Sequence, residues 1–396
     1  MAVAATNKLR RHGLVSLGWR LLAAGALGVC LPLTAAVLPE DRADAMYHRY
    51  SGGGLEVGGP SILARKQLGK FSSFFGNYYV DSISSATIDV VTTASPYEEH
   101  RVEKSLGGDF LYEKTLFNLS ATNSEETDFI ADSANFGVSQ SMFGDLTTLS
   151  LGYGRGWDTI RRRDPSGHGA DPNFEKKAYR QRYRAGLSQV LSKSLLMNLN
   201  YELITDEGFL NNPYRSVRFL DGSGGYSYQL EAYPNTRTSH ALGLKALYYL
   251  PYRAAIHGEI RGYTDTWGVN AVLGEIGYIH PLGKAWTLEA SYRYYTQNNA
   301  DFYSDLFPYQ DAQNYLARDK ELSTYDNHSI GLGASWHLAR HGWGFIDQAS
   351  LNIKYNYIRF NYQDFRDLRV EGVPPGSEPL YSFDAHVYRL FVSIWY

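Results

Sequence analysis

The chain has 396 residues, a formal net charge of −3 at pH 7 and 14% aromatic residues, including 32 tyrosines. Its mean hydropathy of −0.35 is too low for a helical membrane protein, and its mild acidity argues against a nucleic-acid partner. A transmembrane β-barrel fits this balance, because only every second strand residue needs to be apolar.

The N-terminus has the features of an export signal. Four basic side chains precede an apolar run over residues 21–38, and acidic residues follow it. Pro32 within the run and small residues at its end favour a cleaved secretory signal over an inner-membrane anchor. The sequence predicts a signal peptide at 1–36, cleaved near Ala36 or alternatively near Ala45. Export would take the chain to the outer membrane of a Gram-negative bacterium.

Residues 37–60 are harder to place, because glycine-rich stretches at 52–54 and 58–60 interrupt them. Three placements stay open: a periplasmic segment, a segment inside the lumen, or a first strand. The regular pattern begins beyond this region, and residues 61–396 are expected to form the outer-membrane β-barrel.

Residues 178–203 show the alternation most clearly. Tyr179, Tyr183 and Leu187 fall on one face of the first half, and polar side chains occupy the other face. A tight turn is predicted at 192–194, and a second alternating run follows it. In a membrane barrel the aromatic face contacts lipid and the polar face contacts water.

The same plan recurs along the chain, with short turns and longer polar segments alternating. Short turns are predicted near residues 68–70, 113–114, 144–145, 251–252, 281–284 and 339–344. Longer segments are predicted near 82–100, 122–133, 161–177, 207–236, 297–326 and 361–380. This order indicates an all-β, transmembrane, antiparallel up-and-down β-barrel of about 16 strands, with 14 as the alternative count. A soluble β-sandwich fits less well, because it lacks such regular meander order.

A strip of charge is predicted on the lumen wall. Its members are Arg180, Arg182, Arg184 and Glu202, which share the polar faces of neighbouring strands. The preceding strand carries glycine at 152, 154 and 156, and long arginine side chains can lie over such a track. Two interpretations stay open. The strip guides anions or narrows a pore, or it is a salt-bridge network that props the barrel.

The two longest segments, 207–236 and 297–326, hold too much aromatic and aliphatic surface to remain in solvent. We expect them to fold into the lumen or over its mouth. The candidates for a constriction or a ligand contact are Asn211, Asn212, Tyr214 and Arg215, with structural loop packing as the alternative. Five acidic residues between 301 and 321 match no EF-hand spacing, which favours a solvated loop over a calcium site.

No catalytic or cofactor signature emerges. Cys30, the only cysteine, lies in the predicted signal, so the mature chain is expected to lack thiols and disulfides. Ser335 and His337 share a strand face, but no third orienting residue or oxyanion site accompanies them. We expect no enzymatic activity, no metal site and no cofactor.

The C-terminal strand has a wholly apolar face, which consists of Tyr388, Leu390, Val392, Ile394 and Tyr396. It resembles the closing strand of Gram-negative outer-membrane barrels, whose assembly machinery reads a C-terminal aromatic residue and alternating apolar residues. The resemblance implies that the barrel-assembly machinery and outer-membrane lipid are partners.

Several stretches in combination resemble an uncharacterised Gram-negative envelope family, domain-of-unknown-function family 3570. They are residues 47–54, 77–96, 143–148, 205–218, 300–323 and 380–384. The resemblance spans roughly residues 40–396 and implies an outer-membrane barrel without naming a substrate. Members often lie near genes for flavin attachment and thioredoxin-like proteins, which implies periplasmic redox or flavin-linked partners.

The sequence thus indicates an architecture and a location more sharply than a function. The leading hypothesis is a porin-like channel for small polar solutes. The alternative is a non-conducting barrel that acts as a scaffold or secretion partner for a periplasmic or surface redox assembly.

Overall fold

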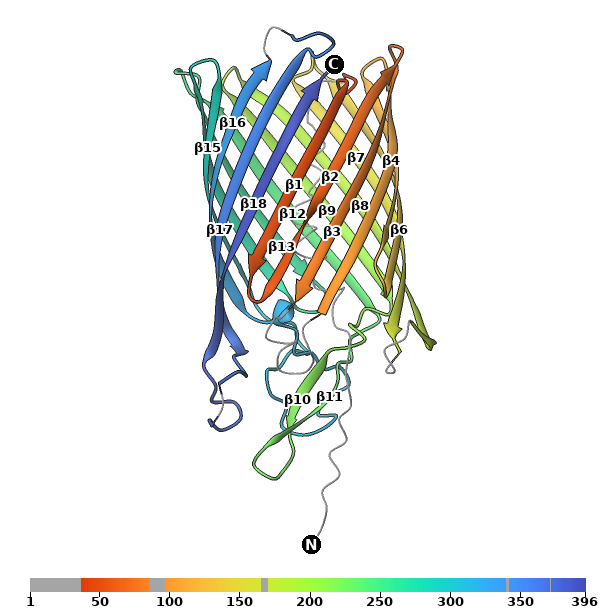
Figure 1. Ribbon diagram of the computed structural model, residues 1–396, viewed down its shortest axis with the longest axis vertical. Helices are drawn as coiled ribbons and strands as arrows, with labels where there is room; N and C mark the ends of the chain where they lie inside the picture. The colour runs from red at the N-terminus through yellow and green to blue at the C-terminus, as the bar shows by residue number, and fades with distance from the viewer. Residues whose placement is uncertain (1–36, 86–96, 165–169, 340–341, 371) are drawn as a thin grey trace.

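The computed structural model describes residues 37–85, 97–164, 170–339, 342–370 and 372–396. The predicted signal peptide lies outside these ranges. Sixteen strands close into one antiparallel barrel, and β10 and β11 form a separate two-stranded sheet (Figure 1). In chain order the elements are β1 (Arg42–Gly52), β2 (Leu55–Leu68), β3 (Ser72–Ser85), β4 (Tyr97–Tyr112), β5 (Thr115–Glu125), β6 (Phe129–Met142), β7 (Thr147–Arg163), β8 (Ala170–Ser192), β9 (Leu195–Gly208), β10 (Ser216–Leu220), β11 (Tyr226–Leu230), β12 (Thr236–Tyr249), β13 (Ala255–Asp265), β14 (Asn270–Leu282), β15 (Trp286–Gln297), the 3₁₀ turn η1 (Lys320–Leu322), β16 (Tyr325–Ala339), β17 (Gln348–Arg366) and β18 (Leu380–Trp395).

The barrel closes between its first and last strands. β1 pairs with β2 on one side and with β18 on the other, in a register that joins Arg42 to Trp395 and Gly52 to Ala385. All other wall strands pair with the wall strands before and after them, and β9 pairs with β12. Closure leaves no open sheet edge, which is the condition for a sheet to cross a bilayer. The predicted up-and-down barrel of 16 strands is confirmed.

The segment 37–60 contributes to the wall itself. β1 and the start of β2 lie within it, so the barrel begins at Arg42 and includes a region for which three placements were open. Gly53 and Gly54 form the turn between these strands with φ angles of +59° and +79°. Two consecutive positive φ angles make a tight hairpin that side chains disfavour, which accounts for glycine here.

The two ends of the barrel differ in their connections. Short turns, such as residues 113–114 and 193–194, join the strands at the end that lies uppermost in Figure 1. The long connections 209–235 and 298–324 lie at the opposite end, where β10 and β11 extend below the wall. Within the described ranges, no helix has the length and hydropathy needed to cross a membrane.

Two predicted loops are largely strand. β5 and β6 leave only residues 126–128 between them, and β7 and β8 extend far into 161–177. Polar side chains pair along these extensions, as between Arg161 and Glu175 at 3.3 Å. Both faces of the extensions are therefore polar, and their sequence lacks the apolar–polar alternation that would have predicted strands. β8 has 23 residues, about twice the 9–11 that cross a bilayer, so its wall extends beyond the lipid.

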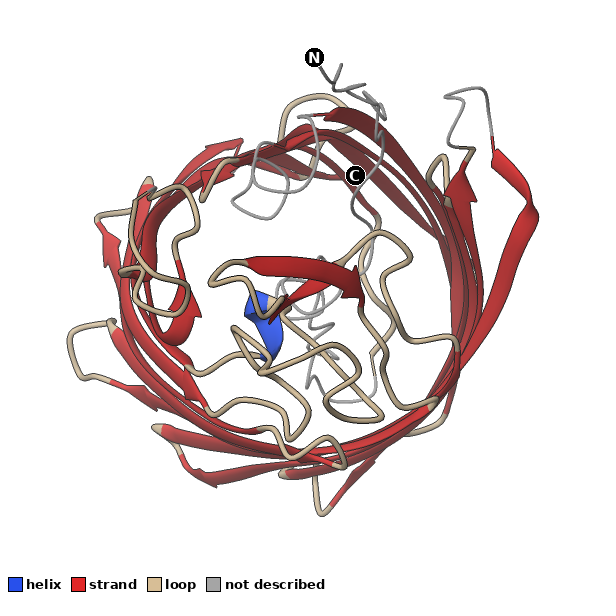
Figure 2. Cartoon of the chain, turned by 90° about the horizontal axis from the view of Figure 1, so that it is seen from below, coloured by secondary structure: helices blue, strands red, loops and turns tan. Residues whose placement is uncertain are grey.

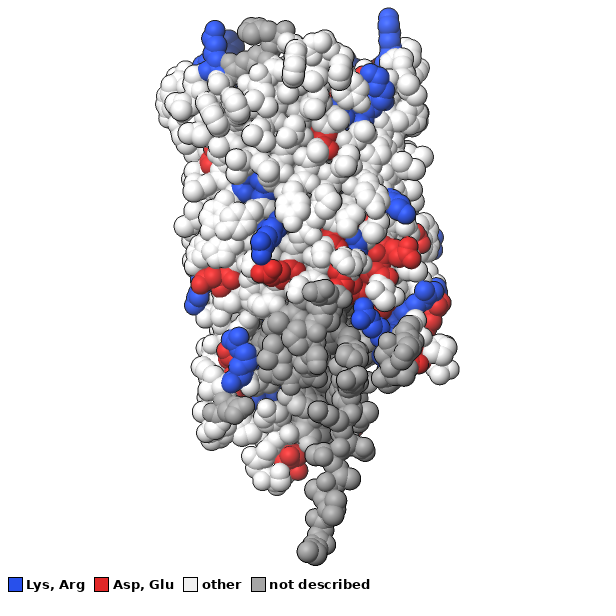
Figure 3. Space-filling view, viewed as in Figure 1, with Lys and Arg blue, Asp and Glu red and all other residues white. Residues whose placement is uncertain are grey.

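The outer face of the wall is apolar where the barrel is nearest the short turns. On β7, Leu149, Leu151 and Tyr153 are exposed, whereas the alternate residue Ser150 is buried. Figure 3 shows a mostly uncharged surface over the upper half of one face, and acidic and basic side chains gathered in its lower half. This distribution fits a lipid-facing band with a polar extension at the loop end.

The two long loops fold over the mouth, as their composition predicts. We call 209–235 and 298–324 together the cap. Seen from below, the cap lies across the opening within the ring of strands (Figure 2). Its aromatic core includes Tyr233 and Phe302, whose ring centroids are 5.5 Å apart, and it packs on Phe360 and Tyr362 of β17. A backbone bridge between Phe219 and Phe307 joins the two loops.

Candidate functional site

The predicted charge strip lies where β7, β8 and β9 run side by side. The register sets Gly152 opposite Arg184, Gly154 opposite Arg182 and Gly156 opposite Arg180. A Cβ atom at Gly152 would lie 3.6 Å from the Cβ of Arg184, and one at Gly154 would collide with Asn135 Oδ1 at 2.5 Å. The glycines therefore leave room beside the arginine stems.

Carboxylates only partly balance the strip. Arg182, Arg184 and Arg261 all form ion pairs with Glu202, at 3.3, 3.1 and 3.3 Å. Arg180 donates from Nε to Asp206 Oδ1 at 2.5 Å. These four cations share two carboxylates, so the cluster carries a formal charge of +4 − 2 = +2.

Solvent reaches this cluster. Arg182, Arg184 and Arg261 keep 26%, 32% and 43% of their side-chain surface accessible. Asn200, on the same inner face of β9, is also exposed. Ions in the lumen can therefore approach the guanidinium groups.

The opposite face of β8 meets the outside, as predicted. Tyr179, Tyr183 and Leu187 are exposed, and the ring of Tyr183 packs against that of Tyr153 at 5.2 Å. An arginine on this face near the bilayer midplane would cost about 2–4 kcal/mol. The alternation therefore holds all three arginines of β8 inside.

The rest of the lumen wall carries charges of both signs. Lys354 pairs with Glu289 at 2.6 Å, and Lys245 pairs with Glu259 at 3.6 Å. Arg389 also lies in the field of Glu289 and is repelled by Arg293, so Glu289 is shared by more than one cation. Positive charge on the lumen wall is therefore not confined to the cluster around Glu202.

The four constriction candidates lie within the cap and bind other loop groups. Asn211 Nδ2 donates to the Glu231 carbonyl at 2.8 Å, and Asn212 Oδ1 accepts from the Tyr214 backbone N–H at 2.9 Å. Tyr214 donates its hydroxyl proton to Asp128 Oδ2 at 2.7 Å, and Arg215 pairs with Asp319. These contacts favour loop packing, through which the residues shape the mouth.

A buried arginine that the sequence did not single out holds the cap together. Arg218 has none of its side chain exposed and pairs with Asp305 and with Glu378, the latter at 2.5 Å. Arg318 reaches the same Asp305 at 2.9 Å. Asp305 and Asp319 are thus buried ion-pair partners, so the expectation of a solvated acidic loop is wrong for both. Burial follows because the aromatic loop packing encloses them.

Glu231 is the most perturbed acid of the cap. Tyr233 donates to it at 2.6 Å and the Arg318 backbone N–H donates at 2.8 Å. Burial, followed by repulsion from Asp319, raises the pKa of Glu231 to about 7, against the attraction of Arg215. The cap therefore contains a carboxyl group that titrates near neutral pH.

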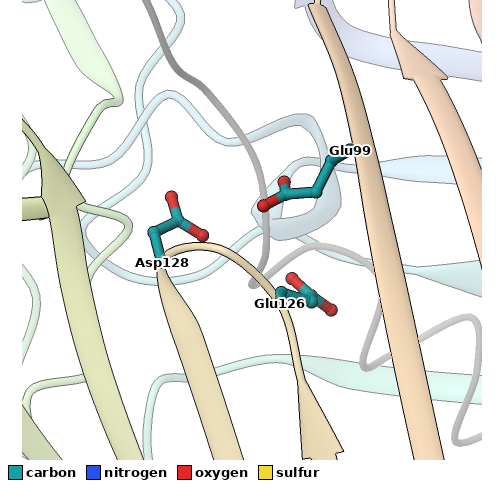
Figure 4. A group of neighbouring side chains, drawn as sticks. All are labelled: Glu99, Glu126 and Asp128. Atoms are coloured by element: carbon teal, nitrogen blue, oxygen red, sulfur yellow. The ribbon is translucent and has the colours of Figure 1, made fainter. Parts of the chain in front are cut away.

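A group of three carboxylates gathers at the loop end of β4 and in the turn between β5 and β6. Oxygen atoms of Glu99, Glu126 and Asp128 all lie within 4.8 Å of one another (Figure 4). The spacing of these residues in the sequence does not predict the group, because Glu99 comes from a different hairpin than Glu126 and Asp128. It is the one group with the donor chemistry of a metal site among the described residues.

The apolar C-terminal strand lies on the closure seam. Tyr388 and Leu390 are exposed on the outer face, and Val392 and Ile394 follow on the same face of β18. Tyr396 donates its hydroxyl proton to the Arg65 carbonyl at 3.1 Å, and the Lys66 ammonium lies 4.8 Å from its ring centroid. These contacts tie the end of the chain to β2.

The family model described as "Protein of unknown function (DUF3570)" matches residues 86–362, and the chain belongs to this family. No curated protein matches the chain.

Solved structures with similar folds include the siderophore receptor PirA from Pseudomonas aeruginosa, at 11% identity and a TM-score of 0.43. The match covers 90% of this chain and 63% of the receptor, so the chain spans less than two thirds of the receptor's length. A bacterial polysaccharide outer membrane secretin matches at 8% identity and a TM-score of 0.47, over 90% of this chain and 99% of the secretin. OmpT of Vibrio cholerae matches at 10% identity and a TM-score of 0.43, over 90% of this chain and 97% of OmpT.

Proposed function

We propose that this DUF3570 protein is an outer-membrane channel for small polar solutes with a preference for anions. The observation that carries the proposal is the cluster of four arginines that share Glu202 and Asp206 on the lumen wall. An uncompensated positive charge beside a water-filled path attracts anions and repels cations.

The surface supports a location in lipid. Apolar side chains are exposed over much of the wall, and large aromatic residues are exposed in the short turns, including Phe71, Phe143 and Trp343. Aromatic side chains at one end of an apolar band are typical of the girdle at a membrane interface. The short turns would face the periplasm and the cap would face outward.

The cap supports a restricted path. Two folded loops with a shared aromatic core occupy the mouth, so a solute has to pass beside or through them. Loops folded into a barrel set the size of what passes. Small solutes fit this arrangement better than large ones.

Ion selectivity tests the proposal. The purified barrel is placed in planar bilayers under a salt gradient, and the reversal potential reports the ratio of anion to cation permeability. The variant with Arg180→Gln, Arg182→Gln and Arg184→Gln is expected to lose most of the anion preference. A matched control replaces three outward-facing arginines, Arg49, Arg155 and Arg359, with glutamine. Equal selectivity in the wild type and the lumen variant would leave only a structural role for the strip.

The second candidate is a non-conducting barrel that serves as a scaffold or secretion partner for periplasmic redox or flavin-linked proteins. The buried core of the cap favours it, because a mouth filled by packed aromatic side chains can be ion-tight. The same bilayer experiment separates the two functions. An absence of current, with envelope proteins co-purifying, would support the scaffold.

A further inference from the structure

The carboxylate group at the loop end has no counterpart in the proposed channel. Glu99 belongs to β4, and Glu126 and Asp128 belong to the turn between β5 and β6. Figure 4 shows the three side chains converging from these two elements. Glu99 and Asp128 are each only 5% exposed, so water compensates little of their charge.

Two oxygens of this group lack a hydrogen bond despite their burial. Among the described residues, neither Glu99 Oε1 nor Asp128 Oδ1 has a hydrogen-bond partner. Thr127 hydrogen-bonds to Glu99, and Tyr214 donates to Asp128 Oδ2, so each carboxylate is anchored while one oxygen stays unpaired. A buried acceptor without a partner is destabilising, and more strongly so when it is charged. A bound cation would satisfy these two oxygen atoms.

Charge in the surroundings does not balance the group. Arg163 acts on both Glu99 and Asp128, and Arg101 acts on Glu126 while it also pairs with Asp81 at 2.8 Å. The three carboxylates and Asp81 carry −4 and the two guanidinium groups carry +2, so a formal excess of −4 + 2 = −2 remains, which is the charge that a divalent cation neutralises.

We propose that Glu99, Glu126 and Asp128 bind a Ca²⁺ ion at the loop end of the barrel. Carboxylate oxygens coordinate Ca²⁺ at about 2.3–2.6 Å, so two oxygens that coordinate the same ion lie up to about 5 Å apart. The separations within 4.8 Å meet this limit. Mg²⁺ binds at about 2.0–2.1 Å in a stricter octahedron, which suits a wider carboxylate group less well.

The site connects the wall to the cap. Asp128 accepts from Tyr214 at 2.7 Å, and the same hydroxyl oxygen accepts from the Arg163 backbone N–H at 2.8 Å. An ion held by Asp128 would fix β4, the turn after β5 and the cap loop around Tyr214 against one another. Calcium binding is therefore expected to slow proteolysis of the cap.

Calorimetric titration of the folded, metal-free barrel with CaCl₂ in detergent tests the site. We expect one Ca²⁺ per chain, with a dissociation constant of about 10⁻⁴–10⁻³ M, as in extracellular modules. The double variant Glu99→Gln/Asp128→Asn should bind at least tenfold more weakly. The control Glu56→Gln/Asp132→Asn removes two exposed carboxylates near the same end and should bind like the wild type. Heat-dependent gel mobility verifies folding, and Glu126→Gln replaces the double variant if that variant does not fold.

Three results would overturn the proposal. Unchanged affinity in the double variant and in Glu126→Gln would place the ion elsewhere. In the second, the wild type binds no Ca²⁺ at CaCl₂ concentrations tenfold above the expected dissociation constant. That result would mean that the carboxylates share a proton instead of an ion. Equal affinity for MgCl₂ would contradict the size argument.

Discussion

At the scale of single residues, the cap depends on buried charge pairs. Arg218 sits in a fully enclosed position between Asp305 and Glu378, and Arg215 pairs with Asp319 nearby. A pair of this kind stabilises little over an apolar pair of the same shape, but removing one partner leaves an uncompensated charge. The aromatic packing of the cap thus makes each of these arginines hard to replace.

Arg218→Ala is expected to open the cap while the barrel wall stays intact. Loss of the guanidinium leaves the buried Glu378 carboxylate without its ion-pair partner and leaves Asp305 paired with Arg318 alone. Breaking a buried pair in this way costs about 3–5 kcal/mol. Limited proteolysis of the exposed turn at residues 221–225 should become at least tenfold faster, whereas gel mobility should still report a folded barrel. Arg49→Ala is the control, because its ion pair with Glu56 is more than half exposed on both sides and should matter little. Equal cleavage rates in the two variants would contradict the role of Arg218.

Glu231 is expected to make the closure of the cap depend on pH. Its pKa is raised from 4.5 to about 7 in the closed cap, chiefly by burial, so the closed cap retains a proton that an open cap releases. The resulting stabilisation is complete below about pH 4.5 and is lost as the pH rises through about 7.

Hydrogen exchange of residues 226–235 checks this sign. Exchange in the wild type, corrected for intrinsic rate, should speed up between pH 5 and pH 8. Glu231→Gln should show less change across the same interval, because its amide does not titrate. A wild type that becomes more protected as the pH rises would contradict the assignment.

At the scale of elements, the strands and the loops carry different kinds of information. The wall strands alternate between lipid and lumen, and the glycine track on β7 lets the arginines of β8 lie along the inner surface. The cap loops have no period, and their contacts come from segments far apart in the chain. Their removal should therefore affect the mouth and spare the wall.

Deleting residues 209–222 is expected to raise the conductance or admit larger solutes. The deletion removes the packing of Asn211 and Tyr214 and the ion pairs of Arg215 and Arg218, all of which hold the cap in the mouth. Single-channel recording with neutral polymers of increasing size measures the change. Removing Ser223 and Gly224 from the exposed tip is the control. An unchanged conductance in a stable barrel would mean that this loop does not constrict the path.

At the scale of the whole molecule, closure of the barrel places a single sheet between lipid on the outside and water on the inside. Outer side chains meet lipid, and inner side chains meet water, so adjacent residues on one strand have opposite surroundings. Leu199 and Asn200 on β9 are such a pair, and both are exposed.

Single cysteines at these two positions are expected to behave oppositely. A fluorophore on Leu199→Cys should be quenched by brominated lipid, whereas Asn200→Cys should react with a charged thiol reagent and resist lipid quenching. The only native cysteine, Cys30, lies in the predicted signal, so the background should be low. Quenching at both positions, or at neither, would contradict this assignment of the faces.

The sequence by itself determined the wall. Period-two alternation identifies strands and their lipid faces because the bilayer imposes an apolar side chain at every second position. For the same reason, the inward direction of Arg180, Arg182 and Arg184 could be predicted from neighbouring strands, as could the pairing of Arg182 and Arg184 with Glu202. Arg180 pairs with Asp206 instead, further along β9. The alternation fails where strands extend beyond lipid, as in residues 161–163 and 170–177, because both faces there meet water.

Only the tertiary structure decided the cap and the carboxylate group. Arg218 and Glu378 are separated by 160 positions, and Glu99 meets Asp128 from another hairpin. No local period links such residues, because closure of the barrel and the packing of aromatic loops bring them together. The sequence suggests that the acids of 298–324 lie in a solvated loop, but burial makes Asp305 and Asp319 ion-pair partners. A charge that water cannot reach is stable only when it is paired.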